Sequence, residues 1–132
     1  MKTILLFGTF DGVHEGHRAC FLQAKKLADH LVVAIAPDNI VKALKGHAPR
    51  ASVTERASVL QKEDLVDEVV VGDQELGSYE VLSMVKPDII GLGYDQHELA
   101  EDVRSWARSR MPNLTIVRLE PFEPETYKSS KL

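Results

Sequence analysis

The sequence predicts an α/β fold: a doubly wound, Rossmann-like parallel sheet of five strands in a single domain that spans residues 1–132. Three observations lead to this prediction. Short apolar runs alternate with segments of helical spacing along the whole chain. These runs are nearly continuous in apolar residues, as in strands that a parallel sheet buries on both faces. The length of 132 residues fits one domain, and no repeat or low-complexity tract interrupts the pattern.

Each element follows from its local pattern, starting at the amino terminus. The run Thr3–Phe7 is apolar almost throughout and predicts a buried strand. Residues 16–28 predict a helix from their spacing. The positions that fall at helical spacing are Ala19, Leu22, Lys26 and Leu27. The run Leu31–Ile35 predicts the second strand, and residues 42–51, which are basic and contain Gly and Pro, predict a flexible loop.

Further along, Ser52-Val53-Thr54-Glu55 is a capping box and predicts a helix that ends near Lys62. The predicted strands that follow are Glu68–Val71, Asp88–Leu92 and Leu114–Val117. The predicted helices between them are Glu80–Val85, which Pro87 ends, and His97–Arg108, which ends near Pro112. Residues 120–130 predict a loop. A last helix is expected to begin at Ser129-Ser130, and we expect it to be missing or truncated because the sequence stops at Leu132.

Composition and charge exclude several classes of protein. Hydrophobic residues make up 44% of the chain and charged residues 27%, which excludes wholesale disorder. The net charge of -4 argues against a nucleic-acid-binding face, so any polyanionic ligand needs a local positive potential. The single Cys20 rules out an intrachain disulfide, and no apolar run approaches the roughly 20 residues of a membrane span. We therefore expect a cytoplasmic protein that binds neither nucleic acid nor membrane.

The most informative segment follows the first predicted strand directly. In doubly wound folds, ligands bind beyond the carboxyl ends of the strands. Gly8 and Gly12 permit a tight turn and a close approach of the backbone to a ligand. The next helix is expected to begin at residues 15–16, so its free N–H groups and the positive end of its dipole face the same crevice. His14 and His17 then project from one face and form a donor-rich pocket suited to phosphate oxygens.

Two other interpretations of these histidines stay open at this point. A histidine at the start of a helix is often a solvated cap with no role in catalysis. His14, His17 and Cys20 could also hold a zinc ion. On a helix, however, residues six positions apart diverge by about 120°. We therefore expect Cys20 to face the core, and we predict no metal site built from side chains.

The segment Gly8-Thr9-Phe10-Asp11, followed by His14-x-Gly16-His17, resembles the signature of the cytidylyltransferase-like superfamily of nucleotidyltransferases, which carries a His-x-Gly-His motif. Members of this superfamily include glycerol-3-phosphate and choline-phosphate cytidylyltransferases, pantetheine-phosphate adenylyltransferase and archaeal-type FAD synthases. The resemblance covers nearly the whole chain. Further similar segments are Lys42-Ala43-Leu44-Lys45-Gly46, Thr54-Glu55-Arg56, residues 86–96, and the spacing from Ile116-Val117-Arg118 to Ser129-Ser130. The last two are most similar to archaeal FAD synthases.

The resemblance implies roles for individual residues. His14 and His17 would contact the triphosphate and stabilise the transition state, and Lys42 would reach the phosphates from a mobile loop. The residues implied in nucleotide binding are Gly8, Thr9, Phe10, Glu15, Gly16, Lys45, Asp95, Arg118, Phe122, Ser129 and Ser130. The alternative for the lysines is a solvated surface loop, and for Asp95 it is a simple N-cap of the following helix. Arg56 is expected to brace the basic loop.

The implied reaction is attack of an acceptor phosphate on the α-phosphate of a nucleoside triphosphate, with release of pyrophosphate. A phosphate monoester is largely a dianion at neutral pH, so no general base is needed. Asp11 and Glu15 are therefore expected to be structural or capping groups rather than nucleophiles. A divalent ion such as Mg²⁺ would accompany the triphosphate, held mainly by phosphate oxygens and water. The same resemblance implies a homodimer.

The leading hypothesis is transfer of AMP from ATP to FMN, which gives FAD. The alternative is a cytidylyltransferase that uses CTP and acts on glycerol 3-phosphate or a similar small phosphorylated polyol. A nucleotide-binding regulatory domain on the same fold is a third, non-enzymatic hypothesis. The first turn does not separate these hypotheses because it handles only phosphates, and the choice of base is expected to depend on contacts around Asp95 and Phe122.

Overall fold

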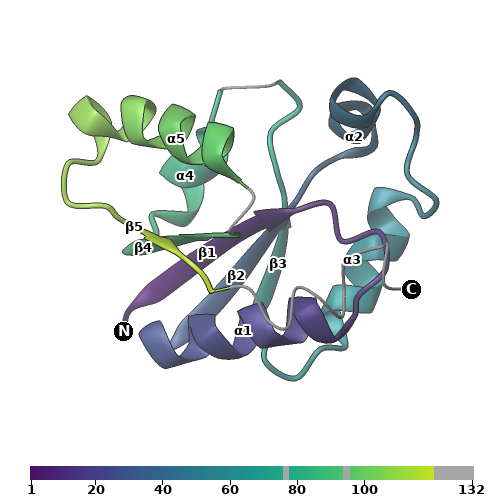
Figure 1. Ribbon diagram of the computed structural model, residues 1–132, viewed down its shortest axis with the longest axis horizontal. Coiled ribbons are helices and arrows are strands. Elements are labelled where there is room, and N and C mark those ends of the chain that lie inside the picture. Colours follow the sequence, from purple (N-terminus) through teal and green to yellow (C-terminus); the bar gives the residue numbers. More distant parts are fainter. Residues whose placement is uncertain (76–77, 94–95, 121–132) are drawn as a thin grey trace.

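The computed structural model describes residues 1–75, 78–93 and 96–120. Within these ranges the strands are β1 (Thr3–Gly8), β2 (His30–Ile35), β3 (Glu68–Val71), β4 (Ile89–Leu92) and β5 (Thr115–Arg118). They form one sheet in the order β3-β2-β1-β4-β5, and every neighbouring pair is parallel (Figure 1). The predicted doubly wound α/β fold is confirmed, and each strand ends within one residue of its predicted bounds.

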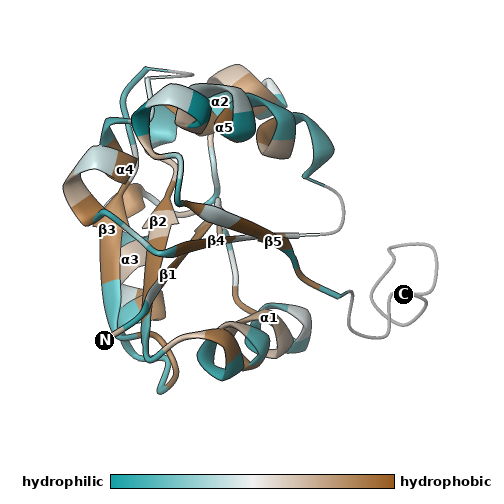
Figure 2. Cartoon of the chain, turned by 90° about the vertical axis from the view of Figure 1, so that its left-hand side faces the viewer, coloured by the Kyte–Doolittle hydropathy of each residue, from teal (hydrophilic) through white to brown (hydrophobic). Residues whose placement is uncertain are grey.

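The central strands are buried on both faces because their residues are apolar almost without interruption. Successive side chains of a strand point to opposite faces of the sheet. Ile4 and Leu6 of β1 therefore join one core cluster, and Leu5 joins the other. Figure 2 shows the central strands as largely hydrophobic, between helices that carry hydrophilic residues. The edge strands β3 and β5 are exposed at both of their ends.

Helices cover both faces of the sheet. On one face, α1 (Glu15–Leu27) and α3 (Val53–Gln61) contribute Phe21 and Leu60 to the core. On the other face, α4 (Glu80–Val85) and α5 (His97–Arg110) contribute Leu82 and Val103. Figure 1 shows these two groups on opposite sides of the strands, with α2 (Asp38–Lys45) beyond the carboxyl end of β2. No helix in the described part of the chain is long and apolar enough to cross a membrane.

The structure corrects the sequence analysis at α2. Residues 42–51 are predicted as a loop, but residues 42–45 are the second half of this helix. The helix forms because Ile40 and Val41 are buried against the rest of the protein. It ends at Gly46, whose φ of 80° is the left-handed conformation that glycine adopts readily. Of the predicted loop, only the part after Gly46 lacks regular secondary structure.

The buried face of α1 is not formed by the leucines whose spacing predicts the helix. Leu22 and Leu27 are 48% and 41% exposed. The buried stripe is instead Phe21, Ala24 and Ala28, at positions i, i+3 and i+7. The large aromatic ring determines the orientation of the helix because it brings more apolar surface into the core than any other side chain of α1. The other helices agree with the prediction, and α3 has the predicted capping box.

The strand order places a crevice next to the first turn. The chain passes from β1 to β2 and β3 on one side of the sheet, and β4 and β5 lie on the other side of β1. At such a switch point the connections after neighbouring strands diverge and leave a crevice at the carboxyl edge. The turn after β1, with the two histidines, therefore lies at this crevice.

Candidate active site

The turn after β1 folds back onto α1 through left-handed backbone conformations. Phe10 has a φ of 52° and Gly12 a φ of 109°. Gly8 makes room for this turn, because a Cβ atom at Gly8 would lie 2.5 Å from Cε2 of the Phe10 ring. The centroid of the Phe10 ring is 5.9 Å from that of Phe21 and 5.0 Å from that of His17. The predicted tight turn thus places an aromatic ring against His17.

His14 and His17 together cap the amino end of α1. His14 is the N-cap residue, and its Nδ1 accepts a hydrogen bond from the backbone N–H of Gly16 at 3.0 Å. Nδ1 of His17 accepts from the backbone N–H of His14 at 3.2 Å. The two rings stack with their centroids 3.9 Å apart, which confirms that they share one face. The pair replaces the Ser or Thr and the Glu or Gln of an ordinary capping box.

These hydrogen bonds determine which nitrogen of each ring carries the proton. Nδ1 needs its lone pair to accept from a backbone N–H, so each neutral ring carries its proton on Nε2 and can donate from there. Gly16 permits this arrangement, because a Cβ atom at Gly16 would lie 2.8 Å from Cε1 of His14. The glycine between the histidines is therefore needed for the His14 ring to fold over the end of the helix.

The environment also keeps His17 neutral. Burial, with a smaller contribution from His14, lowers the pKa of His17 from 6.5 to about 4. Near pH 7 this ring is therefore a neutral hydrogen-bond donor and not a cation or a proton donor for chemistry. The positive end of the α1 dipole lies at the same place. Neutral donors and a partial positive charge at a helix terminus suit phosphate oxygens.

The carboxylates of the first turn have structural partners, as expected. Asp11 accepts from the backbone N–H groups of Arg50 and Ala51 at 2.6 and 3.1 Å. These hydrogen bonds, the first above all, hold the pKa of Asp11 below its usual value. Glu15 forms an ion pair with Arg18 at 2.6 Å. Asp11 therefore ties the loop before α3 to the first turn, and neither carboxylate is needed as a nucleophile.

Arg56 lies beneath the turn and connects several chain segments. It is 1% exposed. Its guanidinium donates to the carbonyl oxygens of Thr9, Ala36 and Ala51 at 2.9, 2.8 and 3.1 Å. It also donates to Oδ1 of Asp38 at 2.7 Å. Arg56 braces the loop before α3, as expected, and in addition it holds the first turn and the start of α2.

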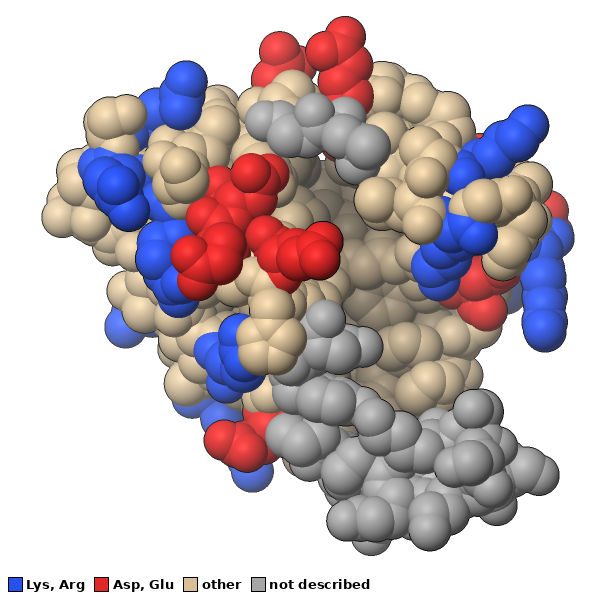
Figure 3. All heavy atoms as spheres, turned by 45° about the horizontal axis from the view of Figure 1, so that its top comes forward, with Lys and Arg blue, Asp and Glu red and all other residues tan. Residues whose placement is uncertain are grey.

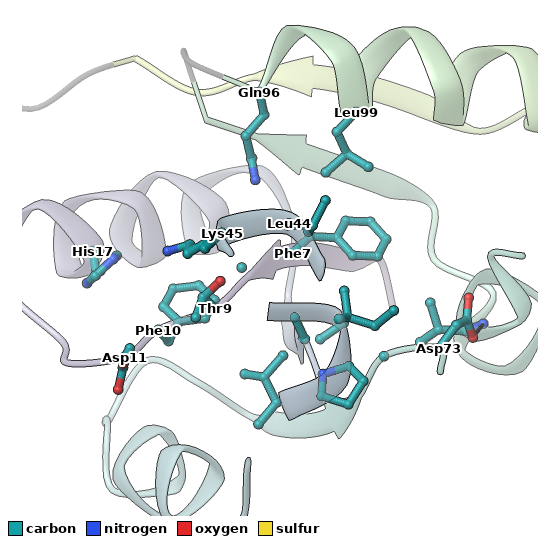
Figure 4. A pocket seen from close by; sticks show the side chains of 18 of the residues that line it. Phe7, Thr9, Phe10, Asp11, His17, Leu44, Lys45, Asp73, Gln96 and Leu99 are labelled. Atoms are coloured by element: carbon teal, nitrogen blue, oxygen red, sulfur yellow. Dashed lines mark hydrogen bonds between the residues drawn. The ribbon is translucent and has the colours of Figure 1, made fainter. Parts of the chain in front are cut away.

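A cavity of about 610 Å³ opens at the carboxyl edge of the sheet beside the histidines. Its volume is in the range of small-molecule sites. Figure 3 shows the surface hollowed, with uncharged residues inside the hollow and acidic side chains on part of its rim. Six residues with implied roles line the cavity: Gly8, Thr9, Phe10, His14, His17 and Lys45. In Figure 4, Thr9 and His17 lie toward one end of the cavity and Asp73 toward the other.

Other residues with implied roles lie elsewhere. Lys42 is exposed and lies on the opposite face of α2 from Ile40 and Leu44, which line the cavity. The mobile loop expected at Lys42 is wrong, because this residue lies in α2. Its expected contact with the phosphates stays a prediction. Arg118 is exposed at the end of the edge strand β5. Gly16 lies beneath the His14 ring. Asp95, Phe122, Ser129 and Ser130 lie outside the described residues, so their roles stay predictions.

The zinc interpretation requires Cys20 to lie beside the two histidines. In residues 1–75, 78–93 and 96–120, no group of three or more His, Cys, Asp or Glu side chains is arranged to hold a metal ion. His14 and His17 use Nδ1 to cap the helix. Cys20 packs against the core, as expected.

Sequence reasoning missed the wall of the cavity that α2, α4 and α5 form. The residues of this wall are Ile40, Leu44, Tyr79, Val81, Gln96 and Leu99, with Asp73 after β3. A signal for two of them exists, because Ile40 and Leu44 are four residues apart after Pro37 and indicate an amphipathic helix. The others come together only through the topology of the sheet and have no local signature.

Known proteins resemble this chain in sequence and in structure. The family described as cytidylyltransferase-like matches residues 5–131. The FAD synthase of Thermococcus sibiricus is 39% identical over 126 residues, which cover 95% of this chain and 85% of that protein. The FAD synthase of Ferroglobus placidus is 38% identical over 135 residues, which cover 100% of this chain and 86% of that protein.

Two solved structures are also similar. The lipopolysaccharide core biosynthesis protein of Thermoplasma volcanium superposes with a TM-score of 0.84 at 30% identity, over 93% of this chain and 99% of that chain. A pantoate-beta-alanine ligase of Francisella tularensis has a TM-score of 0.63 at 14% identity, over 98% of this chain and 66% of that chain. The second similarity shows a shared fold alone.

Proposed function

The chain belongs to the cytidylyltransferase-like family, and on this premise we propose that it transfers AMP from ATP to FMN, giving FAD and pyrophosphate. The similarity to FAD synthases over 95% and 100% of the chain supports this acceptor and this nucleotide. The observation that carries the proposal is the pair of imidazoles that caps α1 at the edge of the cavity. Such a pair can stabilise a phosphate undergoing substitution without taking or giving a proton.

The reaction needs positioning rather than proton transfer. The phosphate of FMN is largely a dianion at neutral pH, so its oxygen attacks the α-phosphorus of ATP directly. A bond forms between this oxygen and the α-phosphorus while the bond from the α-phosphorus to the bridging oxygen breaks. Pyrophosphate leaves with the electron pair of that bond. Asp11 and Glu15 are engaged in structural contacts, which agrees with a mechanism that uses no carboxylate base.

We assign His14 and His17 to the stabilisation of charge in the transition state. A hydrogen bond from Nε2–H strengthens as negative charge builds on the oxygens around the phosphorus. Lys45 adds a full positive charge to the cavity wall. Thr9 lines the same end of the cavity, and its carbonyl is held by Arg56, so the donors of the first turn meet the phosphates in a fixed geometry.

The proposal includes a divalent ion such as Mg²⁺ that enters with ATP and neutralises its phosphates. In the described residues no side-chain cluster is arranged to hold such an ion, so phosphate oxygens and water are its expected ligands.

We also propose a homodimer in the cytoplasm. Sedimentation equilibrium would test the dimer, and a single monomeric species would refute it.

Substrate trials test the function. The protein is incubated with ATP or CTP, together with FMN or glycerol 3-phosphate, and FAD and pyrophosphate are measured. Only ATP with FMN should give both products. Pyrophosphate release only with CTP would make the cytidylyltransferase hypothesis correct, and nucleotide binding without any pyrophosphate release would indicate a regulatory domain.

His17→Ala tests the assignment of the site. It should lower kcat by about a hundredfold or more. The control is His47→Ala, because His47 is exposed and does not line the cavity. Near-normal turnover of a folded His17→Ala protein would remove the catalytic role of this ring.

A further inference from the structure

The aromatic ring of Phe10 has no part in the chemistry described above, yet the first turn is built around it. Gly8 leaves the space that the ring occupies, since a Cβ atom there would lie 2.5 Å from Cε2 of Phe10. Phe10 itself has a φ of 52°, which a residue with a side chain rarely adopts and which persists only where surrounding contacts hold it. We propose that Phe10 is a positioning residue that fixes the plane of the His17 ring, an inference that rests on the proposed function of this histidine.

The hydrogen bond of His17 is too weak to fix the ring by itself. Its Nδ1 accepts from the backbone N–H of His14 at 3.2 Å, which is the upper end of the usual range for such bonds. The second torsion angle of a histidine side chain has a broad preference, so the backbone of α1 does not determine the plane of the ring. Rotation about this torsion would turn the Nε2–H donor away from its direction. A donor that has to meet a phosphate oxygen therefore needs contacts on its ring.

Two rings supply these contacts. His14 stacks on one face of the His17 ring, with 3.9 Å between the centroids and 26° between the planes. Because that face is covered, Phe10 contacts the remaining face or edge, with 5.0 Å between the centroids and 59° between the planes. Figure 4 shows Phe10 beside His17 at the same end of the cavity. A change in the plane of the His17 ring would bring it against one of these neighbours.

Phe10 can support His17 because its own ring is anchored in the core. The residue is 9% exposed and belongs to the same core cluster as Phe21, which is 0% exposed. The centroids of these two phenyl rings are 5.9 Å apart. His17 and Phe21 are four residues apart on one face of α1, so the Phe10 ring packs over two neighbouring side chains of that face. His14, in contrast, is exposed, and Phe10 is thus the buried support of the His17 ring.

The same contact keeps water away from His17. Burial, more than the nearby His14, lowers the pKa of His17 to about 4. A side chain without a flat ring at residue 10 would cover less of the imidazole and admit water. Solvation of the charged form would then raise the pKa of His17 toward its ordinary value. Orientation and desolvation by Phe10 therefore give two separate measurements.

Phe10→Leu and Phe10→Met test the proposal, because both keep an apolar side chain and remove the flat ring. The matched control is Phe21→Leu, since Phe21 lies in the same core cluster and does not line the cavity. FAD synthesis is measured below the melting temperature of every variant. Both Phe10 variants should lower kcat about tenfold or more and keep the KM for ATP within about threefold, because a misplaced donor loses most of its effect in the transition state. Phe21→Leu should lower the melting temperature but keep kcat within about threefold.

Nitrogen chemical shifts of the His17 ring in the nucleotide-free protein provide the second measurement. The His17→Ala spectrum assigns the signals. In the wild-type protein the shifts should report a proton on Nε2 and a pKa of about 4. In both Phe10 variants the shifts should average over the two tautomers, and the pKa of His17 should rise above about 5.

The outcomes separate this inference from the proposed function. A kcat within about threefold of the wild-type value in both folded Phe10 variants overturns the inference. An equal loss of kcat in Phe21→Leu overturns it as well, because turnover would then depend on core packing in general. A lower kcat with unchanged shifts of the His17 ring also overturns it, since Phe10 would then act on another group. If the wild-type protein makes no FAD but the Phe10 variants change the tautomer and the pKa of His17, the positioning role is supported and the proposed reaction fails.

Discussion

Replacing Arg56 with methionine should destabilise the protein strongly, because this side chain joins the first turn, the start of α2 and the loop before α3. The 1% exposed guanidinium donates to three carbonyl oxygens, those of the half-buried residues Thr9, Ala36 and Ala51. Its fourth partner, Asp38, is 48% exposed, so water offsets much of the loss of this ion pair. A buried acceptor that loses its partner costs about 1–3 kcal/mol. Three carbonyl oxygens lose their partner, but water partly reaches these residues. The expected loss of unfolding free energy is therefore about 4 kcal/mol.

This loss is large enough to measure by thermal unfolding. For 132 residues the entropy of unfolding is about 0.28 kcal/mol per kelvin, so 4 kcal/mol lowers the melting temperature by roughly 14 °C. Far-UV circular dichroism follows the transition, and denaturant titration gives the free energy. The control is Arg104→Met, because Arg104 and its partner Glu101 are 53% and 79% exposed, and the expected change is below about 0.5 kcal/mol. If Arg56→Met melts within about 3 °C of the wild-type protein, the bracing role is refuted.

Three further predictions concern the histidine cap and α2. As the pH falls from 6.5 toward 4, the unfolded chain protonates His17 before the folded chain does, so the unfolding free energy should fall by up to about 3 kcal/mol. Denaturant titrations of wild-type protein and His17→Asn check this, and equal pH slopes would contradict it. Gly16→Ala should lower kcat at least tenfold, because the added Cβ atom displaces the His14 ring. Its melting temperature should change by less than about 4 °C, since the helix preference of alanine offsets the weakened cap. A wild-type kcat would show that the ring position is unimportant. Lys45→Ala should raise the KM for ATP several-fold and Lys42→Ala less than twofold, because only Lys45 lines the cavity, and the reverse order in steady-state kinetics would contradict this placement.

The strands could be predicted closely because their signal is local. A strand buried on both faces is apolar at nearly every position, whatever packs against it. The helix α2 could not be predicted in the same way. Its eight residues are too few for a stable isolated helix, and the basic side chains at its end resemble those of a loop. Tertiary contacts stabilise it: Arg56 binds Asp38, and Nδ2 of Asn39 donates to the carbonyl of Gln74 at 3.0 Å.

The candidate site also has one part that the sequence predicts and one part that it does not. The histidines and the glycine between them lie within one helical turn, so their spacing alone predicts that the rings share a face, and the stacking of the two rings at 3.9 Å agrees with this. The opposite wall brings Leu44 of α2 together with Tyr79 and Leu99, which lie far along the chain. Only the strand order makes these residues neighbours, and one sequence contains no pattern for that order.

The spacing of the motif satisfies a folding requirement and a chemical requirement at once. The N-cap and N3 positions of a helix are three residues apart, so a reciprocal cap fixes the distance from His14 to His17. The ring of His14 lies over the residue two positions further along, Gly16, so a residue with a Cβ atom does not fit there. Because both caps use Nδ1, the proton of each neutral ring is on Nε2, where it can meet a phosphate oxygen. Serine and glutamate would cap the helix equally well but would give no such pair of donors. The same hydrogen bonds that start α1 therefore prepare the two rings for phosphate chemistry.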